Sequence, residues 1–155
     1  MLMNKVFRLS QLTSYESDFA LWCAEQGRLL REGKVDALDR ENLAEEIESL
    51  GRSERYEIES RLKVLLVHLL KWSFQPEKRK MGWKATIREQ RGRIARRIAA
   101  SPSLTAYPGE ILAEEYAYAV PDAATETGLS EQTFPATCPF TIEQVLDANW
   151  LPEAE

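Results

Sequence analysis

The residues of this sequence that could carry acid–base or metal chemistry lie between positions 41 and 68. Four glutamates fall within positions 41–48, and the only histidine of the chain, His68, follows them. A histidine beside a carboxylate can hold a metal ion or transfer a proton. Two glutamates could join it: Glu46, at the edge of the apolar face described below, and Glu54, on that face. A metal- or ligand-binding helical enzyme that uses His68 with Glu46 or Glu54 is therefore one hypothesis.

A simpler interpretation of the same residues is structural. On a helix, Glu41, Glu45 and Glu48 share one face, which points away from the apolar residues and would be solvated. A carboxylate metal site inside a helical bundle usually uses a Glu-x-x-His pair, and the sequence has none. His68 then reads as a half-buried side chain hydrogen-bonded to a carbonyl or carboxylate. We favour this interpretation and predict no catalytic residue, no metal site and no cofactor.

A basic segment is the third candidate. Residues 71–97 carry ten Lys/Arg against two acidic residues, a net charge of +8, whereas residues 98–155 carry no Lys or Arg and ten Asp/Glu. Neutralisation of the basic segment by acids such as Glu110, Glu114, Glu115 and Glu126 is the favoured explanation. Nucleic-acid binding through Lys78 to Arg97 is an alternative, although the net charge of −5 argues against it. The possible binding surface comprises Lys78, Arg79, Lys80, Lys84, Arg88, Arg91 and Arg93.

These candidates depend on a central helical stretch over residues 36–74. Its apolar residues recur with the period of an α-helix, about 3.6 residues, so other helices should cover this face. Asp36 is the predicted N-cap, and Pro76 follows the end. Gly51 leaves two alternatives, one continuous helix or a break with a second helix capped by Ser53. The phase favours the continuous helix, which would separate Glu46 from His68 by about 33 Å. The apolar face comprises Leu43, Ile47, Leu50, Ile58, Leu62, Leu65, Leu69 and Trp72.

The rest of the chain reads as further helices. A first helix spans residues 13–33, with Thr13 and Glu16 at capping-box spacing. Further helices span residues 83–100 and 108–127, and Pro121 should kink the second of these or end it early. A short helix capped by Thr141 runs to about residue 149. The predicted fold is all-α: a bundle of about four main helices with a wrapped, irregular C-terminal tail and a short terminal helix. It forms one domain over residues 1–155, with residues 1–12 loosely ordered.

Composition excludes several classes of protein. No segment approaches the ~20 apolar residues of a membrane span, and residues 1–13 lack the apolar core of a secretory signal. Cys23 and Cys138 are far apart in the sequence and belong to no motif, so we expect reduced thiols and a cytoplasmic protein. Phosphate-binding loops and serine-hydrolase motifs are also missing.

Several patches together resemble one bacterial family, known as domain of unknown function 29. The most specific patch is Glu41-Asn42-Leu43 followed by residues 45–51, and the resemblance extends from Tyr15 to Glu153. It implies an all-α domain and transfers no activity, because no function or catalytic residue is established for the family. Pro121 is a departure from the family pattern, in which we expect a continuous helix at this position. The other patches are Tyr15/Asp18/Phe19/Trp22, His68–Trp72, Ile87–Arg91, Ser101–Leu104, Glu126–Leu129, Phe134-Pro135 and Cys138-Pro139.

The sequence thus predicts a non-enzymatic helical bundle that acts by binding a protein partner or a second copy of itself. The lack of catalytic spacing and the segregation of charge favour this function. The enzyme and nucleic-acid hypotheses remain its alternatives, and we expect no membrane partner.

Overall fold

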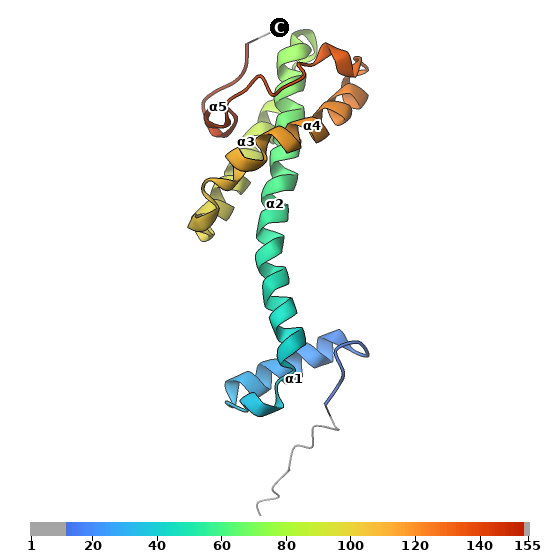
Figure 1. The fold of residues 1–155 in the computed structure, drawn as a ribbon. Helices are drawn as coiled ribbons and strands as arrows, with labels where there is room; N and C mark the ends of the chain where they lie inside the picture. The colour runs from blue at the N-terminus through green and yellow to red at the C-terminus, as the bar shows by residue number, and fades with distance from the viewer. Residues whose placement is uncertain (1–11, 154–155) are drawn as a thin grey trace, which may run out of the picture. The chain divides into compact units, whose positions relative to one another are not determined.

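A computed structural model describes residues 12–153, and over this range the fold is all-α with no strand, as predicted (Figure 1). The expectation for the start of the chain falls, except for Leu12, outside the described residues. Four main α-helices and one short one are joined by 3₁₀ turns. The α-helices are α1 (Phe19–Arg31), α2 (Arg40–Phe74), α3 (Met81–Ala100), α4 (Tyr107–Thr127) and α5 (Ile142–Leu146), and the turns are η2 (Val35–Ala37), η3 (Pro76–Lys78), η4 (Pro102–Leu104) and η5 (Glu131–Thr133).

The central helix α2 passes through Gly51 without a break and is 35 residues long. The prediction of one continuous helix is therefore confirmed. Gly51 does not have a positive φ, and no atom approaches the position where its Cβ would lie. The glycine costs helix propensity without changing the path of the backbone.

The chain divides into two compact units, Met1–Gly51 and Arg52–Glu155. The first contains α1 and the start of α2. The second contains the rest of α2 with α3, α4, α5 and the final segment. That the whole chain forms one domain stays a prediction.

Helix starts in the first unit differ from those predicted. Asp18 caps α1 by accepting a hydrogen bond from the Leu21 amide, so the helix begins six residues later than predicted. The Thr13 amide and hydroxyl instead bind the carboxylate of Glu25. Asp36 lies inside η2 and is not the N-cap of α2. Asp39, directly before the helix, accepts hydrogen bonds from the backbone and side chain of Asn42.

The core of the first unit is small. Its buried side chains over the described residues are Trp22, Gln26 and Leu29. Trp22 donates from Nε1 to Asp39 across 3.0 Å. Gln26 accepts from the Asp39 amide across 2.8 Å, and this bond ties α1 to the start of α2.

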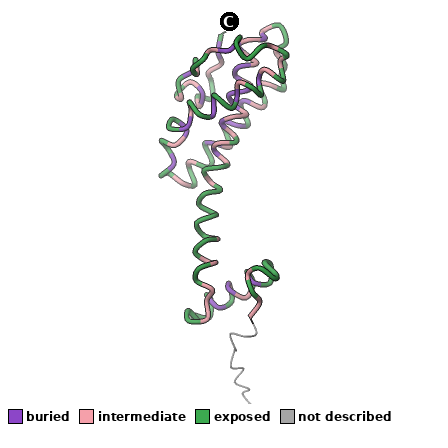
Figure 2. The backbone as a smooth tube through the Cα atoms, turned by 45° about the vertical axis from the view of Figure 1, so that its right-hand side comes forward, coloured by how far each residue is buried: buried purple, intermediate pink, exposed green. Residues whose placement is uncertain are grey.

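The apolar face of α2 is not covered along its first turns, contrary to the prediction. Ile47 is 65% exposed and Leu50 is 69% exposed, while Leu43 is half-buried. Figure 2 shows this as a nearly continuous run of exposed residues in the first half of the helix. The periodicity places these residues on one face correctly, but no described element packs on that face of the first unit.

The second unit has a continuous core around the second half of α2. Here the predicted apolar face is buried from Ile58 to Leu69, with Leu62, Leu65 and Leu69 inaccessible to solvent, while Trp72 is half-buried. Both α3 and α4 lie along this part of α2 (Figure 1). They contribute Ile87, Ile94, Ile111, Tyr116, Ala119 and Ala123 to the core.

The C-terminal segment wraps onto this core, as predicted. Phe134, Phe140 and Val145 are buried in it. The Tyr116 hydroxyl donates to the Pro135 carbonyl across 2.6 Å, and the Ser73 hydroxyl donates to the Glu153 carbonyl across 3.0 Å. These bonds fix the irregular segment to α4 and α2.

Two details of the last helices differ from expectation. The helix α4 includes Pro121 and continues to Thr127, so the proline does not end it early. Gly128, with φ of +74°, forms its C-cap. The capping box of Thr141 and Gln144 is present, but α5 ends at Leu146 rather than near residue 149. No helix over residues 12–153 has the length and apolar character to cross a bilayer.

Candidate functional site

The three residues proposed for metal or proton chemistry have separate partners in the structure. Glu46 belongs to the first unit and accepts a short hydrogen bond from the Tyr15 hydroxyl. Glu54 belongs to the second unit and pairs with Arg97 at 3.1 Å. His68 has neither glutamate as a partner. Over the described residues, no group of three or more His, Cys, Asp or Glu side chains could hold a metal ion.

The environment of His68 is that of a structural histidine. It is half-buried, and its Nδ1 lies 2.9 Å from the Val64 carbonyl oxygen, one turn earlier in α2. Burial lowers the pKa of His68, and the charge of Lys71 acts in the same direction. The neutral ring then donates its proton to the carbonyl oxygen. This agrees with the structural interpretation drawn from the sequence.

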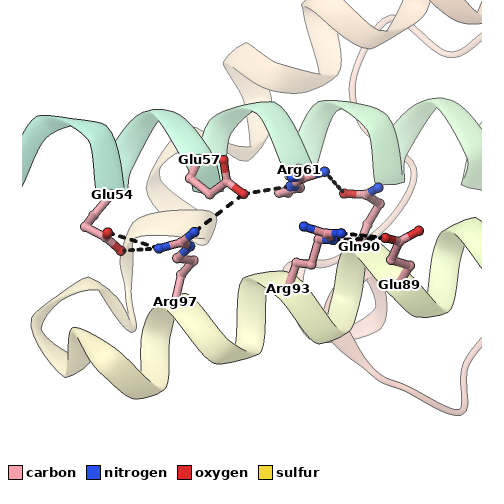
Figure 3. Close-up of polar contacts among 7 residues, drawn as sticks. All are labelled: Glu54, Glu57, Arg61, Glu89, Gln90, Arg93 and Arg97. Atoms are coloured by element: carbon pink, nitrogen blue, oxygen red, sulfur yellow. Dashed lines mark hydrogen bonds and ion pairs between the residues drawn. The ribbon is translucent and has the colours of Figure 1, made fainter. Parts of the chain in front are cut away.

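The basic segment is partly neutralised by carboxylates of α2 and, as predicted for Glu126, by one carboxylate of the acidic tail. Arg97 bridges Glu54 at 3.1 Å and Glu57 at 3.9 Å, and Arg61 pairs with Glu57 at 2.9 Å (Figure 3). A separate ion pair joins Arg93 to Glu89 at 2.9 Å within α3. Two acids of the tail form ion pairs: Asp122 pairs with Lys63 of α2 at 3.4 Å, and Glu126 pairs at 3.1 Å with Lys71, the first cation of the basic segment.

Two tryptophans beside the basic connector are covered by cations. The Arg79 guanidinium lies 4.7 Å from the ring centre of Trp72 and donates to the Trp72 carbonyl. The Lys71 ammonium lies 4.6 Å from the ring centre of Trp83 and also pairs with Glu126. Cations on aromatic faces stabilise folded structure. One face of each ring is therefore occupied by a cation of the same chain.

The predicted binding surface divides into residues used internally and residues that are free. Arg79, Arg91 and Arg93 make the internal contacts described here and below. Lys78, Lys80, Lys84 and Arg88, together with Arg96, form no ion pair among residues 12–153 and are exposed.

Arg91 has a role that the sequence did not indicate. Its side chain is 6% exposed, and it donates from Nε to the Val145 carbonyl at 2.8 Å and from Nη2 to the Gln144 carbonyl at 3.3 Å. Burial lowers the pKa of Arg91, whereas the charge of Asp147 opposes that change. The helical phase of Arg91, next to Ile87 and Ile94, indicated a position beside the core but not these backbone acceptors.

Exposed apolar side chains gather in the first unit. Six large apolar residues there are between 48% and 69% exposed. Single exposed apolar residues are common, but so many in a unit with so small a core are typical of a binding surface. They are Phe19, Leu21, Leu30, Val35, Ile47 and Leu50.

Comparison with known proteins finds one family. The family model described as Domain of unknown function DUF29 matches residues 14–151. No curated protein and no solved structure matches the chain.

Proposed function

This chain belongs to the family described as domain of unknown function DUF29, and we propose that it is a non-enzymatic binding module. The partner is a basic, amphipathic helical segment of another protein, and the binding surface lies in the first unit. Since the family description carries no activity, the proposal rests on the surface of this chain.

The exposed apolar side chains of the first unit carry the proposal. Ile47 and Leu50 lie three residues apart on α2, after the half-buried Leu43. Such a ridge suits the apolar stripe of a second helix. Covering one large aliphatic side chain contributes about 1.5–3 kcal/mol. A partner helix that covers this ridge would therefore add several kilocalories per mole to the stability of a unit with three buried side chains.

Charge determines the kind of helix. Residues 12–51 carry ten acidic and four basic side chains, a net charge of −6. Glu41 and Glu48 are exposed and have no partner among the described residues. This field attracts a basic segment and repels a second copy of the same unit. A basic helix with an apolar stripe would match both the apolar ridge and the negative charge of the first unit.

The test uses model peptides of defined composition. A dye-labelled helical peptide of leucine and lysine, with its leucines on one face, is titrated with the full chain and followed by anisotropy. We expect saturable binding that weakens as salt rises, because salt screens the attraction. A leucine–glutamate peptide of the same pattern should not bind. Equal binding of both peptides, or no binding of either, would overturn the proposal.

Matched variants locate the surface. Replacing both Ile47 and Leu50 by serine should weaken binding by at least tenfold, equivalent to about 1.4 kcal/mol. Met81→Ser removes another highly exposed apolar side chain, in the second unit, and should leave affinity unchanged. Sedimentation over a range of protein concentrations tests whether a second copy of the chain binds to this surface. Association of the chain with itself, abolished by the serine pair, would assign the surface to a second copy instead.

The two alternative functions have less support. His68 is bonded to a backbone carbonyl and lacks Glu46 and Glu54 as partners. Metal analysis of untagged protein tests the enzyme hypothesis, which needs a stoichiometric metal that is lost on His68→Ala. Filter binding across a salt series tests the nucleic-acid hypothesis, which needs affinity that falls with salt.

The proposal also includes a cytoplasmic location. Cys23 and Cys138 are free thiols, and Cys23 is exposed. Such thiols persist in a reducing compartment.

A further inference from the structure

A hollow of about 420 Å³ lies between α3 and residues 148–151. Its apolar wall includes Met81, Ala85 and Leu151. Cationic side chains also line it, and no acidic side chain does. Ligand pockets in proteins start at about 300 Å³ and combine an apolar wall with a few polar groups. The hollow belongs to the second unit, so it is independent of the function proposed above.

Arg91 supplies a buried positive charge at the hollow. Its Nε and Nη2 bind the Val145 and Gln144 carbonyl oxygens, while its Nη1 makes no hydrogen bond to any residue from 12 to 153. No carboxylate in this range forms an ion pair with it, although the charge of Asp147 acts on it from further away. Burying a charge without a counter-charge is costly. A guanidinium held in this way has a donor left for an anion that enters the hollow.

Two further cations stand on the same side of α3. Lys84, Arg88 and Arg91 follow at i, i+4 and i+7, so they share one helix face. Lys84 and Arg88 line the hollow, are exposed and have no acidic partner among the described residues. Three cations from successive turns of α3 therefore line one hollow with a largely apolar wall.

We propose that this hollow binds a small organic anion made of a carboxylate head and an apolar body. The carboxylate accepts hydrogen bonds from Arg91 and Arg88, since guanidinium groups match carboxylate oxygens in geometry and charge. The body lies on Met81, Ala85 and Leu151. The apolar wall distinguishes this ligand from inorganic phosphate, and the cations distinguish it from a neutral lipid.

Calorimetric titration of the full chain with four probes below their aggregation concentrations tests both parts of the ligand. The probes are decanoate, decanol, decylammonium and inorganic phosphate. Decanoate should bind at one site, at least tenfold tighter than decanol, while decylammonium and phosphate should not bind. Decanol binding as tightly as decanoate would remove the role of the cations. Phosphate binding as tightly as decanoate would remove the role of the apolar wall, and failure of decanoate to bind would overturn the site.

Variants locate the site without disturbing the backbone bonds of Arg91. Arg88→Gln and Lys84→Gln remove exposed charges, and together they should weaken decanoate binding at least tenfold. Ala85→Trp fills the hollow and should abolish binding. Arg96→Gln removes an exposed cation of the same helix outside the hollow and should leave affinity unchanged. Unchanged decanoate affinity in the double variant Ile47→Ser/Leu50→Ser would exclude binding to the apolar surface of the first unit. Full affinity in both the double Gln variant and Ala85→Trp would place decanoate elsewhere and overturn the proposal.

Discussion

Arg91 of α3 donates a hydrogen bond of 2.8 Å from Nε to the carbonyl oxygen of Val145, a buried core residue of α5. A second bond from Nη2 reaches the Gln144 carbonyl. One charged side chain thus satisfies the Val145 carbonyl near the end of the short helix α5 and shares the Gln144 carbonyl with the Asp147 amide. The irregular C-terminal segment is fixed to the bundle by α3 as well as by its own apolar side chains.

The first prediction concerns this attachment. Arg91→Met keeps an unbranched side chain but removes the guanidinium and both of its bonds, so the Val145 carbonyl loses its donor while the Gln144 carbonyl keeps the Asp147 amide. We expect the free energy of unfolding to fall by about 2–3 kcal/mol, the usual cost for hydrogen bonds to a charged group. Urea denaturation followed by circular dichroism measures the change. Arg96→Met, an exposed position of the same helix, should change stability by less than about 0.5 kcal/mol. Equal stability of the two variants would contradict the anchoring role.

The second prediction separates the two aspartates near the start of α2. Asp39 accepts from Trp22 Nε1, from the Asn42 side chain and from the Asn42 amide. Asp39→Ala should destabilise the first unit by about 1–2 kcal/mol, as the loss of an N-cap does. Asp36→Ala should be close to neutral, because Asp36 is exposed and does not cap the helix. Hydrogen exchange of amides in residues 12–51 measures both. A larger effect at Asp36 would contradict this assignment.

Low pH should weaken the hydrogen bonds that Asp39 accepts. The hydrogen bond from Asn42, with that from Trp22, lowers the pKa of Asp39 below its ordinary value of 3.8. A carboxyl group with a lowered native pKa contributes stability above its unfolded pKa and loses it as pH falls through the native one. Protection of the first unit should therefore decrease below about pH 4 in the natural chain. Asp39→Asn should lack that step.

The helical phase of α2 could be read from the sequence, but not which of its turns are covered. Leu43, Ile47 and Leu50 continue the spacing of the buried leucines of the second unit. Periodicity reports that residues share a face and carries no information about what packs on that face. The N-cap was misplaced for a similar reason, since Asp36 and Asp39 are equally good capping residues and only the turn η2 selects between them.

The candidate sites could be predicted in part. The half-buried state of His68 was predicted, and its partner, left open between a carbonyl and a carboxylate, is the Val64 carbonyl. The partners of the arginines did not follow, because sequence gives the charge of a segment and not its distance to particular acids. The tail was expected to supply carboxylates, and Glu126 does so for Lys71, whereas Arg91 receives backbone carbonyls of the tail. Composition gives no information about which backbone groups will act as acceptors.

The third prediction concerns a buried carboxylate. Glu115 of α4 is 8% exposed, and burial raises its pKa above the ordinary value of 4.5, with Glu59 and Glu114 adding to the rise. A raised native pKa means that the ionised form costs stability, so stability falls as pH rises through the native pKa. Glu115→Gln should stabilise the chain at pH 7 by about 1 kcal/mol, the low end of the cost of an unpaired buried polar group.

The pH profile provides the control for this effect. At pH values below 4.5 the carboxyl group is protonated in both the native and unfolded chain, so the advantage of glutamine should disappear. Glu114→Gln, at an exposed position, should show no such profile. Thermal unfolding of both variants from pH 4 to pH 8 measures the difference. A Glu115→Gln chain that is less stable than the natural one at pH 7 would show that the carboxylate has a favourable partner.

The last prediction concerns Gly51, where α2 passes from one unit to the other. Its φ is not positive, and a Cβ added there would meet no atom within 4 Å. Alanine at this position gains helix propensity and reduces the freedom of the unfolded chain, so Gly51→Ala should stabilise α2 by about 1 kcal/mol. Gly128→Ala is the matched control, because φ of +74° strains any residue with a Cβ and should make that variant less stable. Helix content by circular dichroism and hydrogen exchange around residue 51 measure the two changes. If Gly51→Ala destabilised the chain, helical geometry at this glycine would not be the state that the protein occupies in solution.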